Sequence, residues 1–472
     1  MAVNERSLYQ AASAPRLERH PDDIKSGNRL SAIFGVAVLV SAMVVADMPR
    51  GLRASELSLP VNLTAGDVAL IMGGSGVPTP TQQYADTAAD LYLRPNGFGS
   101  TPAIPVNPEP FNGEWSGTNG FAGLFQAIQQ AIAGGDMSIH AAADPSLQAN
   151  GFGGTPEVLT TPELFTNRDL SETQGAADLL RAIQQAIADG KVSADNPLYA
   201  FGYSQSSALS GLTMQQLASA GVPADDLHFV LVGDPSAPNG GIYSEFGLTD
   251  IAPGTNDLTP DSLYPTDVYT LEYDPVADWP RYSSDLLSDL NAYEGLLYEH
   301  LAYLGLTPQQ VSDAIPLDTT GDSLTSYYMI PSETLPILDP LLLTPIIGQP
   351  LYDLLEPDTS ILVNLGYGSI TEGWNQGPAD VVNTVDWGLP NMDWNQVFAA
   401  LDTGAQQGWD AFTADLMNPA TYQVEPLVDS PALTPLIDAE YGAGLIDTIH
   451  PDSIFQVLVG LIGMDSPAAL LP

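Results

Sequence analysis

The residues whose chemistry is easiest to name surround Ser204, in the run GYSQS at 202–206. The apolar NPLYAFGY before this serine predicts a β-strand, and the following SQSSALSGLTMQQLASA, closed by Gly221, predicts a helix. A serine between a strand and a helix has the position of a nucleophile elbow, where a sharp turn exposes the hydroxyl and nearby N–H groups can stabilise an oxyanion. Gly202 supplies the first small residue, but Ser206 stands where the common pattern has glycine. Ser204 is therefore either a nucleophile or a serine in a loop.

A serine nucleophile needs a histidine base, which in folds with such an elbow follows both the serine and the acid in the chain. His300 and, as a fallback, His450 lie far enough beyond Ser204 for this role. His300 can also be interpreted as an ordinary residue on a helix face. His228 directly precedes an apolar segment that predicts a buried strand, so we interpret it as a structural histidine.

The acid should follow a later strand. TDVYTLEYDP predicts such a strand, and the segment LEYDPVADWP offers Asp274 and Asp278.

We expect no metal or other cofactor, because no His and Asp cluster has the spacing of metal ligands and the chain has no cysteine. The lack of cysteine also excludes thiol catalysis and disulfides.

The charge of the chain argues against nucleic acids and anionic lipids as partners. Its 472 residues contain 12 Lys and Arg against 57 Asp and Glu, a net charge of −45. Because seven of the basic residues lie within 1–53, residues 54–472 are strongly acidic. Such a surface repels nucleic acids and anionic lipid head groups, so we expect no nucleic-acid partner and a substrate without negative charge.

The amino-terminal region predicts export. Basic residues precede an uncharged apolar segment, Leu30–Ala46, which is typical of a signal peptide or a signal anchor. Cleavage and retention of this segment both stay open. We expect residues 54–472 to lie outside the cytoplasm, in the cell envelope, with the amino-terminal segment as the contact with the membrane.

Two near-copies of one segment precede the serine. NGFGSTPAIPVNPEPF and AIQQAIAGG, within 96–135, recur as NGFGGTPEVLTTPELF and AIQQAIADG within 150–190. Each copy is interpreted as a loop followed by an amphipathic helix, the second at 173–190. A first strand is expected in DVALIMGGSGVP, at 67–78. Apolar runs that alternate with helices predict an α/β fold with a central parallel sheet.

Later segments complete the predicted organisation. A helical period covers 283–304, and the apolar run Leu335–Leu355 is interpreted as core. We place the main domain at 61–380 and a carboxy-terminal extension of mixed helix and loop at 381–472.

Several segments together resemble one family. GYSQSSA, EYDPVADWP, LLYEHLAYL and the block YYMIPSETLPILDPLL…GQPLYDLLEPDTSILVNLGYG resemble the PE-PPE carboxy-terminal domain, a family of mycobacterial serine hydrolases that is similar to cutinases. The resemblance covers roughly 68–368, and the block at 328–368 is its most specific part. It implies an α/β-hydrolase fold, here enlarged by insertions. Within the family, the chain resembles stand-alone, membrane-anchored members, some of which are acyltransferases of trehalose glycolipids.

The resemblance also implies site residues. It places the nucleophile at Ser204, the histidine at His300 and the acid in YDPVAD, where Asp274 is favoured and Asp278 is the alternative. The oxyanion hole would use the backbone N–H of Gln205 and a donor at Ser75.

Three functions follow from these observations. The first is a serine esterase acting on acyl ester lipids of the envelope through an acyl-enzyme. The second is an acyltransferase in which a sugar hydroxyl of a trehalose-type glycolipid replaces water. The third is a catalytically inactive envelope protein whose acidic surface serves interaction.

Overall fold

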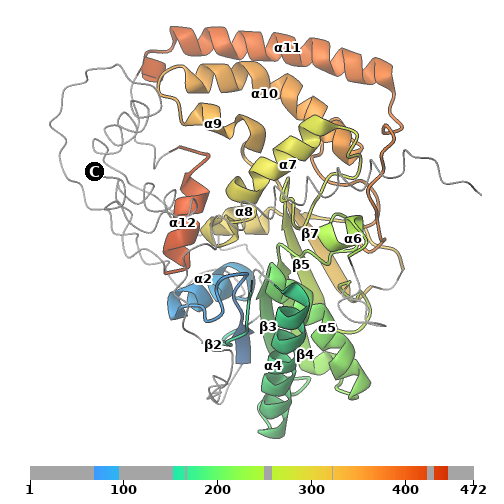
Figure 1. Cartoon of the computed structure of the whole chain (residues 1–472). Helices are drawn as coiled ribbons and strands as arrows, with labels where there is room; N and C mark the ends of the chain where they lie inside the picture. The colour runs from blue at the N-terminus through green and yellow to red at the C-terminus, as the bar shows by residue number, and fades with distance from the viewer. Residues whose placement is uncertain are drawn as a thin grey trace, which may run out of the picture. The chain divides into compact units, whose positions relative to one another are not determined.

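A seven-stranded sheet forms the centre of the protein (Figure 1). The computed structural model describes residues 68–94, 152–164, 167–248, 258–321, 323–422 and 430–444. The strand order is β2-β1-β3-β4-β5-β7-β6, and every pair is parallel except β6 with β7. The strands are β1 (Val68–Ile71), β2 (Thr155–Val158), β3 (Leu198–Tyr203), β4 (Leu227–Val232), β5 (Thr266–Leu271), β6 (Ile315–Pro316) and β7 (Thr325–Ile330). The predicted α/β fold with a central parallel sheet is confirmed.

Helices cover both faces of this sheet, which explains why its central strands are continuous apolar runs. Successive residues of a strand point to opposite faces. Thus Leu70 packs with α4 and α5, whereas its neighbours Ala69 and Ile71 pack with α2 and with segments near the carboxyl end. The covering elements are α2 (Gln82–Tyr92), α4 (Arg168–Ala188), α5 (Gln205–Ser219), η1 (Ala224–Asp226), α6 (Ile242–Glu245), η2 (Tyr303–Gly305), α8 (Pro308–Ser312) and α12 (Thr434–Gly442).

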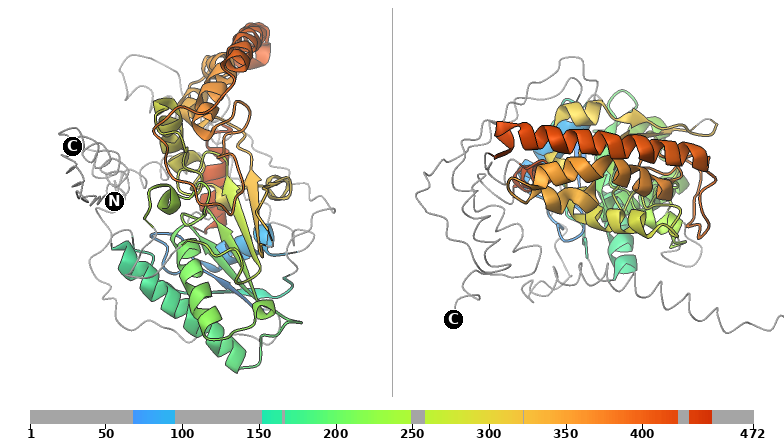
Figure 2. Two further views of the ribbon diagram at one scale, coloured as in Figure 1. Left: turned by 90° about the vertical axis from the view of Figure 1, so that its right-hand side faces the viewer. Right: turned by 90° about the horizontal axis from the view of Figure 1, so that it is seen from above.

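A second group of helices lies beyond the carboxyl ends of β5 and β7, in both views of the molecule (Figure 2). We call α7 (Leu286–Tyr298), α9 (Asp339–Leu342), α10 (Gly348–Asn364) and α11 (Trp394–Met417) the helical layer. Three short helices adjoin them in the chain: η3 (Pro336–Leu338) before α9, η4 (Leu365–Tyr367) after α10 and η5 (Pro419–Tyr422) after α11. A small core joins the layer to the sheet, because Tyr273, after β5, packs with Leu335, Val363 and Tyr367.

The structure corrects three local predictions. The segment 150–190 is not only a loop and a helix, because it contributes β2 to the edge of the sheet before α4 begins at Arg168. The helix expected over 283–304 ends at Tyr298. The run Leu335–Leu355 is core only in part, since Leu335 is buried but Leu355 is exposed. The first copy, 96–135, lies outside the described residues.

No helix within the described ranges combines the length and the apolar character needed to cross a membrane. The segment Leu30–Ala46 lies outside these ranges.

Glycines let α11 approach α10 closely. A Cβ atom at Gly408 would lie 2.2 Å from the carbonyl oxygen of Leu354, and one at Gly404 would lie 2.3 Å from Oδ1 of Asp358. The contact at Gly408 is with backbone, so no side-chain rotation can relieve it.

Gly408→Val should therefore separate the two helices. We expect the free energy of unfolding to fall by about 1–3 kcal/mol, as in other overpacked contacts. Denaturant unfolding measures it. Gln407→Val places the same side chain at the neighbouring exposed position, so equal midpoints for the two variants would contradict the close contact.

Candidate active site

Ser204 occupies a strained turn between β3 and α5. Its φ of 59° and ψ of −116° lie in a region that residues other than glycine rarely adopt, at a cost on the order of 1–3 kcal/mol. The N–H of Ser204 donates to the carbonyl of Val232 at 3.0 Å, which ties the turn to β4. A Cβ atom at Gly202 would lie 2.7 Å from the carbonyl oxygen of Ser206, so only glycine fits there. This is the geometry of a nucleophile elbow.

Ser206 replaces the expected second glycine with a hydrogen-bonded side chain. Its hydroxyl accepts from the N–H of Tyr203 at 2.7 Å and donates to the carbonyl of the same residue at 3.1 Å. The side chain is fully buried, so these bonds satisfy a polar group that would otherwise be costly. Serine at this position therefore closes the turn.

A continuous hydrogen-bonded chain joins Ser204, His300 and Asp274. Nε2 of His300 lies 3.0 Å from Oγ of Ser204, and Nδ1 lies 2.9 Å from each carboxylate oxygen of Asp274. His300 lies two residues beyond the end of α7, in a turn, and its N–H donates to the carbonyl of Gly295 at 2.9 Å. Because β3 and β5 are parallel, their carboxyl ends bring Ser204 and Asp274 to the same edge of the sheet.

Tyr303 is a site residue that sequence reasoning missed. Its hydroxyl donates to Oδ2 of Asp274 at 2.8 Å and accepts from the N–H of Leu271 at 2.9 Å. Burial, and then the charge of Asp274, raise the pKa of Tyr303 well above its usual value, so it stays a donor. The N–H of Val276 donates to Oδ1 at 2.8 Å. The available sequence signal was a tyrosine three residues after His300.

The alternative acid, Asp278, does not join this chain. Its Oδ1 accepts from the N–H of Asn375 at 3.3 Å, and its Oδ2 has no hydrogen-bond partner among the described residues. Burial raises the pKa of Asp278 well above its usual value, and the negative charges of Glu272 and Asp274 raise it further.

The predicted oxyanion residues lie beside Ser204. The loop after β1, residues 72–77, approaches the elbow through Gly74, where a Cβ atom would lie 3.5 Å from Cβ of Ser204. The side-chain amide of Gln205 donates to Oγ of Ser75 at 3.3 Å and to the carbonyl of Leu164 at 3.0 Å. Gln205 is the first residue of α5, and the first N–H groups of a helix have no partner within it.

The other two histidine predictions have different outcomes. His228 pairs with Asp267 at 2.9 Å and stacks on Tyr199, at a ring separation of 5.3 Å, which fits a structural residue of β4. His450 lies outside the described residues. Among the described residues, no group of three or more His, Asp and Glu side chains is arranged to hold a metal ion.

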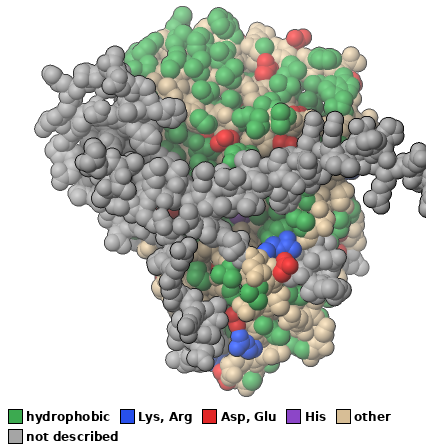
Figure 3. Space-filling view, viewed as in Figure 1, with side chains coloured by type: hydrophobic (Ala, Val, Ile, Leu, Met, Phe, Trp, Pro, Cys, Tyr) green, Lys and Arg blue, Asp and Glu red, His purple; other side chains and the backbone are tan. Residues whose placement is uncertain are grey.

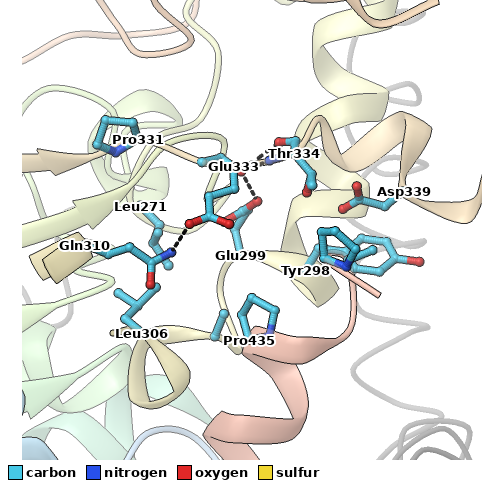
Figure 4. A pocket seen from close by; sticks show the side chains of 14 residues that line it. Leu271, Tyr298, Glu299, Leu306, Gln310, Pro331, Glu333, Thr334, Asp339 and Pro435 are labelled. Carbon is cyan, nitrogen blue, oxygen red and sulfur yellow. Dashed lines mark hydrogen bonds between the residues drawn. The ribbon is translucent and has the colours of Figure 1, made fainter. Parts of the chain in front are cut away.

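A small acidic pocket lies on another side of the turn that carries His300 (Figure 4). Glu299, Glu333 and Asp339 line it, and Gln310 donates to Glu333 at 3.1 Å. Ser204, Asp274 and His300 are not among its lining residues. We therefore do not identify this pocket with the site of acyl chemistry.

Glu163 is hydrogen-bonded to the loop after β1. Its carbonyl accepts from the N–H of Gly76 at 2.8 Å, and its Oε1 accepts from the hydroxyl of Thr161 at 2.7 Å. Oε2 has no partner among the described residues. Burial raises the pKa of Glu163 to about 8, against the effect of the Thr161 bond, and the charge of Glu172 adds to the increase.

The sheet, the elbow and the chain of serine, histidine and aspartate define a protein of the α/β-hydrolase class. Residues 153–368 match the PE-PPE domain. The chain therefore carries a PE-PPE domain, as its motifs indicated.

Its relatives are mycobacterial PE and PPE proteins. The PPE family protein PPE28 of Mycobacterium tuberculosis is 36% identical over 400 residues, which are 82% of this chain and 53% of that protein. A protein of the same species named Esterase PE16 is 33% identical over 367 residues, 76% of this chain and 58% of the relative. The chain thus spans little more than half the length of these two relatives. No solved structure gives a significant match.

The raised pKa of Glu163 predicts a pH-dependent stability. The folded state binds this proton more tightly than the unfolded state does, so the contribution is complete below pH 4.5 and is lost as the pH rises to about 8. In Glu163→Gln, we expect the fall in unfolding free energy between pH 5 and pH 9 to shrink, by a value on the order of 3 kcal/mol. Denaturant unfolding at several pH values measures it.

The exposed Glu333→Gln serves as the control and should decline with pH as the wild type does. Parallel pH profiles for the wild type and Glu163→Gln would rule out the buried, protonated glutamate.

Proposed function

We propose that this chain is a serine esterase that cleaves acyl esters of lipids. The observation that carries the proposal is the hydrogen-bonded chain Ser204–His300–Asp274 at a strained elbow. The PE-PPE domain and the relative named Esterase PE16 support it.

The first half-reaction forms an acyl-enzyme. Nε2 of His300 takes the proton of the Ser204 hydroxyl while Oγ attacks the ester carbonyl, and the carboxylate of Asp274 stabilises the resulting imidazolium. The carbonyl oxygen becomes an oxyanion, which accepts hydrogen bonds from the N–H of Gln205 and from Ser75. As the intermediate collapses, the alcohol leaves with the proton from Nε2.

Water completes the cycle. His300 takes a proton from the water, the hydroxide attacks the acyl-enzyme, and Ser204 recovers its proton as the carboxylic acid leaves. The body of the protein is strongly acidic, because 57 Asp and Glu stand against 12 Lys and Arg, seven of which lie within 1–53. These charges disfavour an anionic head group, so the substrate class that fits is an uncharged acyl ester.

Ser204→Ala should abolish ester hydrolysis. We expect kcat to fall by several orders of magnitude, about 10⁶-fold if the three residues act as one unit. Hydrolysis of a p-nitrophenyl ester, together with labelling by a fluorophosphonate, measures the loss. Ser219→Ala, at the exposed end of α5, is the matched control.

Labelling of Ser204→Ala, or retention of more than a few per cent of the wild-type activity, would contradict the nucleophile. With an acylated trehalose as substrate and a sugar acceptor in excess, the esterase should release free acid. New polyacylated sugar without free acid would make the chain an acyltransferase instead.

Asp274→Asn and Asp278→Asn should differ sharply although they lie four residues apart. Asp274→Asn removes the acceptor for Nδ1–H of His300, so we expect kcat to fall on the order of 10⁴-fold. Burial raises the pKa of Asp278 and so favours its neutral carboxyl, which an amide imitates, and Asp278 makes no bond to His300, so Asp278→Asn should keep most of the activity. Steady-state kinetics on one ester decides. A larger loss in Asp278→Asn than in Asp274→Asn would exchange the two roles.

A further inference from the structure

The longest helix of the helical layer leaves large apolar side chains in solvent. On α11, Phe398 is 62% exposed and Trp409 is 58% exposed, and Trp394 and Leu416 are also exposed. Isolated exposed apolar residues are ordinary, but a contiguous group of this size marks an interaction surface. The space-filling view shows apolar side chains gathered over the part of the molecule that the layer occupies (Figure 3).

These side chains share one face of α11. Trp394, Phe398, Trp409 and Leu416 are separated by 4, 11 and 7 residues, spacings that return to the same side of a helix. A different face, with Val397, Gly404 and Gly408, is buried, and its glycines meet α10. The apolar arc of α11 is therefore wider than its contact with α10 requires.

The exposed apolar surface continues onto neighbouring segments. The strap at 381–389, which precedes α11, exposes Leu389 by 71%, and the start of α7 exposes Leu286 by 68%. The hydroxyl of Ser284 donates to the carbonyl of Gly388 at 2.7 Å, so the strap and the start of α7 lie side by side. We call α11, this strap and the outer side of α7 the apolar face.

The charge of the apolar face restricts its partner. Arg281 is the last Lys or Arg of the sequence, so neither the strap nor the layer contains one. Asp402 and Asp410 are exposed along α11. A surface with carboxylates and without cations repels anionic head groups and attracts none, so its apolar side chains must meet a partner without net negative charge.

The apolar face is also connected to the chemistry. The layer lies beyond the carboxyl ends of β5 and β7, the edge that carries Ser204 and Asp274 (Figures 1 and 2). The chain runs from Asp274 into α7 and from the end of α7 into the turn with His300. A lipid surface held by the layer would therefore lie next to the segments that carry the site.

We propose that the apolar face docks the protein onto an acyl-lipid surface of no net charge, such as an aggregate of its own ester substrate. The inference deepens the proposed esterase function and rests on it. Tryptophan and phenylalanine suit this role, because they insert large apolar rings at a lipid boundary without needing a matching pocket.

Droplet binding tests the proposal separately from catalysis. In the full chain with Ser204→Ala, which consumes no lipid, binding is measured by flotation with triolein droplets coated with phosphatidylcholine. Adding Phe398→Ser and Trp409→Ser should weaken binding at least about tenfold, since two large side chains lose apolar burial. Replacing part of the coat by phosphatidylglycerol should weaken binding too, and high salt should relieve that loss.

The matched control is Thr403→Ser with Gln406→Ser, two exposed polar positions of the same helix, which should bind as the parent does. In the catalytically intact chain, the Phe398 and Trp409 substitutions should lower hydrolysis of droplet ester relative to soluble ester. If the wild type does not hydrolyse soluble ester, the esterase proposal is refuted. If the parent does not bind droplets, or if the Phe398 and Trp409 substitutions leave binding unchanged, the docking face is refuted. A dimer in light scattering that the two substitutions dissociate, without droplet binding, would assign the face to a second copy.

Discussion

A carboxylate without exposed surface is the constraint on which the site depends. Asp274 is fully buried, and a buried charge is tolerated only where hydrogen bonds replace its water. Val276, Tyr303 and His300 supply those bonds from the turn after β5 and from the segment after α7. The turn that carries His300 must therefore fold back under the end of β5, and this fixes the imidazole in front of Ser204.

Hydrogen bonds also hold the strained turn at Ser204. The strained conformation of Ser204, with its positive φ, is maintained by bonds on either side, from its own N–H to β4 and from the side chain of Ser206 to Tyr203. Because these partners belong to the sheet and its turns, they hold the half-buried serine in its strained conformation at the carboxyl end of β3. The sheet and the turns at its carboxyl ends hold the reacting atoms, and the helical layer lies beyond the ends of β5 and β7.

Local sequence predicted the elements better than it predicted their contacts. The strand, turn and helix around Ser204 follow from periodicity, because each depends on neighbouring residues. The bond from Tyr303 to Asp274 joins residues 29 positions apart, and no local pattern reports it. The helix before His300 was predicted too long, since its apolar spacing continues past the point where the chain turns. The preference for Asp274 over Asp278 came from family resemblance, and β2 was missed because Pro156 makes its segment look like a loop.

The two outermost strands bear on solubility. As described, the sheet ends in β2 on one side and in β6 on the other, and each contains a proline, Pro156 and Pro316. Proline has no N–H to offer to an incoming strand, and β6 is also only two residues long. Copies of this chain are therefore poor templates for one another by edge-to-edge strand addition. A protein that displays so much apolar surface on its helices is protected from fibrous self-association at the margins of its sheet.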